Sequence, residues 1–222
     1  MTYDLTELQK KIHRIVEGNV DYPTSGDDDY ELRTGDINDF ISEWYKEEGV
    51  LWNELWKMAS FASTSATSYD LSATDDIDFI GGFVELVPST GATTYWDVKK
   101  LEDVELIKDS QERFCYFTGD QNNGFTLNFN PNAYPGAGTI KFPYYKIPAD
   151  LVNGTDKPEM SDPTYLVNMV ASQLLAEDDP SGSDKHFTLG QNKLRAMKTR
   201  NAMTPPWMSD RLEDKRGVGF GR

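Results

Sequence analysis

Residues 139–175 read TIKFPYYKIPADLVNGTDKPEMSDPTYLVNMVASQLL, and this stretch decides the fold that we expect. Its first part, Thr139 to Tyr145, has the two-residue period of a strand. Asp162 and Pro163 suit the start of a helix, because Asp accepts hydrogen bonds from free backbone N–H groups and Pro needs no donor there. The stretch therefore predicts a strand, a polar linker and a helix. The apolar stripe of that helix is formed by Leu166, Val170 and Leu174.

Apolar residues at helical spacing predict two helices before this stretch. The first is Leu5 to Val16, and the second begins at Asp36. Its apolar stripe continues beyond Gly49 to Met58, and Gly49 either breaks this helix or weakens it. Residues 21–35 between them are acidic and hold Pro, Ser and Gly, so we expect a loop. The aromatic residues of the second helix are expected to serve core or subunit packing. They are Phe40, Trp44, Trp52 and Trp56, the last two of which should lie on one side of the helix.

The period changes to two between Asp78 and Tyr145, which predicts a β-rich region. Asn123-Gly124 lies between two aromatic-rich runs and predicts a tight hairpin turn, because both residues tolerate positive φ. The hydroxyl-rich residues 60–72 are expected to be a linker, and Tyr144 and Tyr145 are expected to pack in the core. The strands expected besides Thr139–Tyr145 are Phe79–Val87, Thr94–Trp96, Arg113–Thr118 and Phe125–Asn130.

The order of these elements predicts an α+β fold, a small helical bundle with a β-rich antiparallel insertion and an extended C-terminal tail. Residues 1–68 would supply the N-terminal helices of the bundle and residues 69–148 the insertion. Residues 149–203 would supply the C-terminal helices, the last of them Lys185 to about Ala202, and residues 204–222 the tail. The tail holds glycines and prolines with scattered apolar residues, which is typical of a segment that docks on a partner.

The charge of the chain is strongly negative, −15 in 222 residues with a sequence pI near 4.5. Such a field repels phosphate, which disfavours wrapping of nucleic acid and binding to anionic membrane. Residues 185–222 differ, since they hold nine Lys and Arg against three Asp and Glu. This asymmetry suggests self-assembly or docking to an acidic partner, or else a solvated helix face and a frayed terminus. We expect no signal peptide and no membrane-spanning segment, and the single cysteine, Cys115, excludes a disulfide framework and fits a reducing compartment.

Motifs that carry chemistry are missing from the sequence: it has no glycine-rich phosphate loop, no nucleophile elbow and no zinc-protease motif. His13 and His186 fall on separate expected helices, and His13 is expected at the surface. The acidic runs Asp27–Asp29 and Asp75–Asp78 do not have the spacing of a calcium loop. The sequence therefore predicts no catalytic residue, no metal site and no cofactor, and hence a protein that is not an enzyme.

The stretch 139–175, taken with the order of elements, resembles the head-to-tail adaptor (connector) proteins of tailed bacteriophages. In that family a small helical bundle carries a β-rich insertion, whose last strand ends in a Tyr-Tyr pair before a polar linker and an Asp/Pro-started helix. The matching positions here are Ile140, Phe142, Tyr144, Tyr145, Pro148, Asp162, Pro163, Ala171 and Leu174.

The resemblance implies a ring of about a dozen copies, whose subunit interface must be heterologous to close. Such a ring belongs to the virion neck, is made in the host cytoplasm, binds the portal protein, meets the tail or a tail-completion protein, and extends the DNA channel. Packaged DNA would pass without sequence-specific binding. The basic last helix would meet the portal or the DNA through Lys193, Arg195, Lys198 and Arg200. The tail would dock on the portal through Pro205, Pro206, Trp207, Met208, Arg211 and Phe220.

Two alternatives stay open at this point. A tail-completion or tail-terminator ring would use the same acidic, ring-forming chemistry. A carbohydrate-binding surface module would instead stack sugars on exposed aromatic faces of the β region. The aromatic residues considered for that role are Tyr95, Trp96, Tyr134 and Tyr144.

Overall fold

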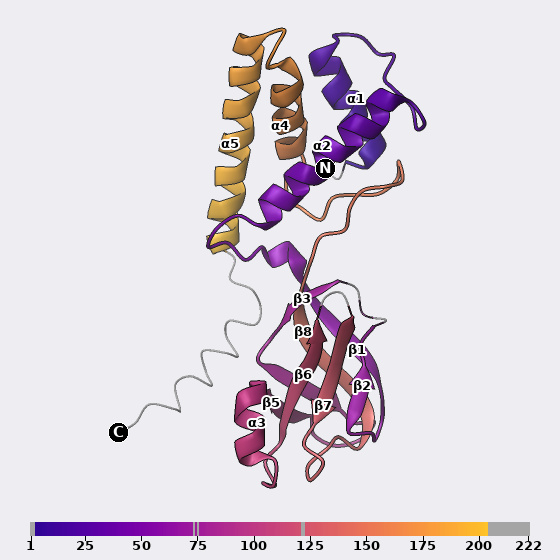
Figure 1. Ribbon diagram of the computed structural model, residues 1–222, viewed down its shortest axis with the longest axis vertical. Coiled ribbons are helices and arrows are strands. Elements are labelled where there is room, and N and C mark those ends of the chain that lie inside the picture. The colour runs from indigo at the N-terminus through magenta and orange to yellow at the C-terminus, as the bar shows by residue number, and fades with distance from the viewer. Residues whose placement is uncertain (1–2, 73, 75, 121–122, 204–222) are drawn as a thin grey trace, which may run out of the picture. The chain divides into compact units, whose positions relative to one another are not determined.

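The computed structural model describes residues 3–72, 74, 76–120 and 123–203, and these form two compact units (Figure 1). The helical unit comprises the described residues up to Leu55 and again from Pro148, and the β unit is Trp56–Ile147. The β unit is therefore inserted between two parts of the helical unit. The residues expected to dock on the portal lie outside the described residues, namely Pro205, Pro206, Trp207, Met208, Arg211 and Phe220.

The helical unit is built around α4 (Thr164–Leu175), whose buried side chains contact three other helices. These are α1 (Leu5–Val16), α2 (Asp28–Tyr45) and α5 (Pro180–Met203). A 3-10 turn, η1 (Asn53–Leu55), follows α2. Gly190 of α5 packs so close to Met169 of α4 that an added Cβ would lie 2.6 Å from the methionine sulfur, which allows the two helices to approach closely.

The predicted first helix is confirmed with its bounds, and Asp4 caps it by accepting a hydrogen bond of 2.9 Å from the Glu7 N–H. The second helix begins at Asp28 instead of Asp36. It ends at Tyr45, before Gly49, so the apolar residues from Leu51 to Met58 are not part of it. Acids in its first turn interact favourably with the N-terminal end of the helix dipole, so an acidic run that suggests a loop starts a helix here. Helix α5 likewise begins earlier than predicted, at Pro180, since proline is compatible with a first helical position.

The β unit is one mixed sheet with the strand order β1-β8-β4-β5-β6-β7-β2, and β3 also pairs with β8. Strands β5 and β6 run parallel and are connected by α3 (Leu101–Ile107), as parallel neighbours need a crossover. All the other pairs are antiparallel. The strands are β1 (Trp56–Thr64), β2 (Ser68–Asp70), β3 (Ile77–Ile80), β4 (Phe83–Val87), β5 (Thr94–Val98), β6 (Phe114–Asp120), β7 (Gly124–Phe129) and β8 (Ala137–Lys146).

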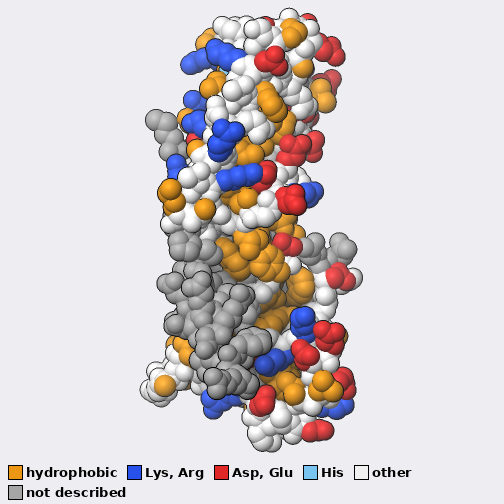
Figure 2. Space-filling view, turned by 90° about the vertical axis from the view of Figure 1, so that its left-hand side faces the viewer, with side chains coloured by type: hydrophobic (Ala, Val, Ile, Leu, Met, Phe, Trp, Pro, Cys, Tyr) orange, Lys and Arg blue, Asp and Glu red, His pale blue; other side chains and the backbone are white. Residues whose placement is uncertain are grey.

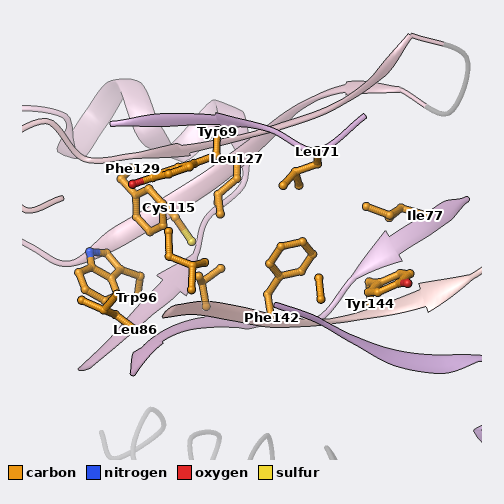
Figure 3. Close-up of a cluster of buried hydrophobic side chains, with 13 residues drawn as sticks. Tyr69, Leu71, Ile77, Leu86, Trp96, Cys115, Leu127, Phe129, Phe142 and Tyr144 are labelled. Atoms are coloured by element: carbon orange, nitrogen blue, oxygen red, sulfur yellow. The ribbon is translucent and has the colours of Figure 1, made fainter. Parts of the chain in front are cut away.

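The sheet curls into a half-barrel, so its two end strands, β1 and β2, which are consecutive in sequence, meet through their side chains. The rings of Phe61 and Tyr69 lie 5.4 Å apart, and the Ser63 and Tyr69 hydroxyls are 2.9 Å apart. The curl encloses a hydrophobic core, into which side chains point from both halves of the sheet (Figure 3). The core residues are Ala59, Tyr69, Leu71, Ile77, Val84, Leu86, Trp96, Cys115, Leu127, Phe129, Ile140, Phe142 and Tyr144.

The predicted fold class, a small helical bundle with an antiparallel β insertion, is wrong. The β part is a large curled sheet of eight strands with its own core, and it is mixed instead of purely antiparallel. Two features hid this from the sequence. Residues 56–70, which supply β1 and β2, read as the end of a helix and a linker. Helix α3 has seven residues, of which Val104 alone is buried, so it lacks the apolar stripe that marks a longer helix.

Strand β1 forms because of its partner and not because of its own pattern. It is rich in Ala, Ser and Thr, yet all nine of its residues pair with β8, from Trp56 opposite Tyr145 to Thr64 opposite Ala137. Pairing with a distant strand overrides weak local propensity. The hairpin of β6 and β7 is confirmed, but Asp120 pairs with Gly124, so Asn123 and Gly124 do not form a two-residue turn.

Candidate interaction surface

Most residues predicted to pack are buried, but two of the tryptophans are not placed as expected. Trp44 of α2 and Trp52 stack with ring centroids 4.9 Å apart, and the Trp52 indole N–H donates to the Trp44 carbonyl oxygen at 2.8 Å. Trp52 lies after α2 and Trp56 starts β1, so they do not share one side of a helix as predicted. Trp56 and Leu174 are half-buried. The buried residues of the predicted set are Phe40, Trp44, Trp52, Tyr144, Tyr145, Leu166 and Val170.

Two of the four basic residues predicted for the last helix have partners within the helical unit. The Lys193 ammonium lies 3.1 Å from Asp162, at the start of α4, and the Lys198 ammonium forms an ion pair with Glu47. Both pairs connect α5 to residues distant in the sequence. These two lysines therefore stabilise the position of α5, which leaves Arg195 and Arg200 as the basic residues available to a partner.

Asp162 does more than begin α4. It accepts a hydrogen bond of 3.2 Å from the Thr164 N–H, another from the Thr164 hydroxyl, and the ion pair with Lys193. Burial alone would raise the pKa of Asp162, but the bonds from Thr164 and Lys193 outweigh burial and lower the pKa below its ordinary value. Asp162 is thus charged at neutral pH and links the start of α4 to the middle of α5.

The outward side of α5 forms a face that we call the α5 face. Buried Gly190, Leu194 and Met197 turn toward α4, and the opposite side of the helix is exposed. Within the described residues, neither Arg195 nor Arg200 has an ion-pair partner. Figure 2 shows Lys and Arg side chains gathered on the helical unit. A shallow hollow on this face is lined by Asn192, Arg195, Ala196, Thr199, Arg200 and Met203.

Helix α2 presents an outward face of the opposite charge, the α2 face. Leu32 is 69% exposed in its middle, with Gly35 beside it. Burial raises the pKa of Asp36 and the neighbouring Asp39 raises it further, while a hydrogen bond from Gln173 lowers it, with a net rise. A second shallow hollow is lined by Asp28, Glu31, Leu32, Gly35, Asp36 and Asp39. The residues of this face lie three or four positions apart in the sequence, which is helical spacing. Because the segment up to Gly35 is rich in acids and turn-forming residues, the sequence favoured a loop there.

The prediction that His13 lies at the surface is wrong. His13 is buried, with its Nε2 2.6 Å from the Asn19 side-chain oxygen and its Nδ1 3.0 Å from an Arg33 nitrogen. Arg33 always donates, so Nδ1 accepts and Nε2 carries the proton. Arg33 is itself buried and lies 3.8 Å from Glu17. The group ties α1 to α2, and every member has a structural partner.

The aromatic residues considered for carbohydrate binding do not form one exposed platform. Trp96 and Tyr144 belong to the buried core, and the Trp96 indole N–H donates to the Ala133 carbonyl oxygen at 2.7 Å. Tyr95 and Tyr134 are exposed by 41% and 48%. A sugar-stacking site made of all four rings is therefore excluded by the burial of two of them.

The described part of the chain contains no group of three His, Cys, Asp or Glu residues placed to hold a metal ion. No helix in the same part is long and apolar enough to span a membrane. A hollow of about 320 Å³ at one end of the β unit is lined by Leu71, Ile77 and Phe125, with Asp76 as its one carboxylate among the lining residues. No protein-family model and no curated protein matches the chain.

Proposed function

We propose that this chain is a non-enzymatic structural protein of a tailed-bacteriophage virion, a head-to-tail adaptor. It would assemble as a ring beneath the portal, extend the DNA channel and provide the platform for the tail. Its partners would be further copies of itself, the portal protein and a tail or tail-completion protein. It would be located in the virion neck.

The single observation that carries the proposal is the α5 face. Arg195 and Arg200 have no ion-pair partner in the described residues, and they share an exposed surface with Ala196 and the 77% exposed Met203. Exposed arginine next to apolar surface is typical of protein–protein interfaces. The helix leads directly into residues 204–222 in the sequence, so the chain combines a helical face suited to assembly with the proposed docking tail.

The charge of the rest of the chain suits the proposed channel. A protein that must let DNA slide through its ring gains from a surface that does not bind phosphates, because phosphate contacts supply most non-specific affinity. The overall charge of −15 supports this role. We therefore expect no tight, salt-sensitive DNA binding by the chain at physiological salt.

The experiment that tests the proposal is co-sedimentation with portal particles from the same virus. Full-length protein should sediment with the particles, whereas a chain ending at Met203 should stay in solution. A full-length Trp207→Ala, Phe220→Ala variant should also lose binding, and Phe187→Ala, which changes an exposed aromatic residue of α5, should retain it. Equal binding by the full-length and shortened chains would overturn the role of the tail, and no binding by either would overturn the adaptor proposal.

A further inference from the structure

We infer that the α2 face of one copy docks on the α5 face of the next copy, and that this contact is the subunit interface of the ring. The inference rests on the proposed function for its ring, but the contact itself follows from the charges and the exposed apolar residues of the two faces. The occupant of the α5 face is thus a second copy of this chain.

Charge complementarity selects this occupant. The α2 face carries four carboxylates, of Asp28, Glu31, Asp36 and Asp39, and none has an ion-pair partner in the described residues. The α5 face carries the guanidinium groups of Arg195 and Arg200, also unpaired there. Arginine binds carboxylate bidentately and is favoured at interfaces for that reason.

Both faces also expose apolar surface. Leu32 of the α2 face is 69% exposed, and Gly35 one turn later has no heavy atom within 4 Å of an added Cβ, so a neighbouring helix can approach there. The α5 face offers the small Ala196 beside Met203, bordered by the two arginines. The contact would therefore bury an exposed leucine placed among acids against exposed apolar side chains placed among bases.

The positions of the two faces make the contact heterologous. Helices α2 and α5 both pack on α4, and both belong to the helical unit. The α2 face and the α5 face are lined by different residues on different helices, so a contact between them joins two unlike patches. A contact between unlike patches leaves one free patch on each side of a dimer, so it continues until the ring closes.

Cross-linking tests the contact with the full-length chain. Leu32→Cys and Ala196→Cys variants, each made separately, are mixed and treated with a short bis-maleimide. Cys115 is buried and does not react. The control pair replaces Ala196→Cys by Leu106→Cys, which lies on α3 and is 84% exposed in the native chain. We expect dimers between the Leu32→Cys and Ala196→Cys chains in clear excess over the control pair and over either variant alone.

Salt and charge reversal give a second readout. Raising the ionic strength from about 0.1 M to about 1 M shortens the Debye length from about 10 Å to about 3 Å, so the excess should shrink. Adding Arg195→Glu and Arg200→Glu to the Ala196→Cys chain should abolish the cross-link. Adding Glu31→Lys and Asp39→Lys to the Leu32→Cys chain should then restore it. A cross-link yield no higher than that of the control pair would overturn the interface. So would a charge reversal on α5 whose effect the compensating changes on α2 do not restore.

The same reaction on portal particles separates this inference from the proposed function. Cross-linked rings that form in solution but do not bind portal would support the interface and overturn the adaptor role. Portal-bound rings without the cross-link between residues 32 and 196 would overturn the interface and leave the adaptor role intact. A cross-link from residue 196 to the portal would also overturn the interface, because it would assign the α5 face to the portal.

Discussion

At the scale of single residues, Gly119 near the end of β6 shows how the β6–β7 hairpin depends on the absence of a side chain. Its φ is +98°, and an added Cβ would overlap the carbonyl oxygen of Gly124 across the hairpin. Gly119→Ala should therefore lower the free energy of unfolding by more than about 1 kcal/mol. Gly136→Ala is the matched control, because Gly136 is in the same unit with open space around it and no positive φ. Urea denaturation checks both, and equal stabilities for the two variants would contradict the account.

Asp162 predicts a dependence of stability on pH. Because the fold lowers its pKa, the group stabilises the folded chain above its unfolded pKa of about 3.9, and this contribution is lost as the pH falls through the lower folded pKa. Asp162→Ala should cost about 0.5–2 kcal/mol at pH 7. Thermal unfolding from pH 7 to pH 3 should show the difference shrinking at the acid end. Asp162→Asn, which keeps an oxygen acceptor for Thr164, should lose less than the alanine variant.

At the scale of elements, the core of the β unit determines how the sheet is held in its curl. Phe142 of β8 is fully buried and contacts Phe61 of β1 and Phe117 of β6 with ring centroids 6.3 Å and 5.6 Å away. Phe142→Ala should therefore cost about 3–5 kcal/mol, by lost burial and a residual cavity. Leu106→Ala, at an exposed position of α3, should change stability by less than about 0.5 kcal/mol. Denaturation curves of both variants test this, and a similar small effect of Phe142→Ala would contradict the core.

Elements whose signals are local could be predicted from the sequence, and those that depend on a partner could not. Helix α1 has its own cap and apolar spacing, so its bounds were predicted correctly. Strand β1 has no such pattern and exists through its pairing with β8. The count of basic residues predicts that the last helix meets a partner, which stays a prediction, and the sequence does not reveal that Lys193 and Lys198 pair within the helical unit. The α2 face was missed because its acids and glycine suggested a loop.

At the scale of the whole molecule, the chain consists of two compact units with different tasks in the account. The helical unit carries the two charged faces that we assign to neighbouring copies, and it ends in α5. The β unit has its own core, closed by side chains from both halves of one curled sheet. Both charged faces belong to the helical unit. Ring assembly and portal docking can therefore be tested by substitutions there and in residues 204–222, without changing any strand of the β unit.

Electron microscopy of portal particles mixed with the full-length chain, averaged along the channel axis, shows directly whether the protein forms an adaptor ring. We expect a closed ring of added density beneath the portal, coaxial with the channel and absent when the chain ends at Met203. Portal particles that look the same with and without the full-length chain, under conditions in which the protein is folded and in excess, would contradict this expectation.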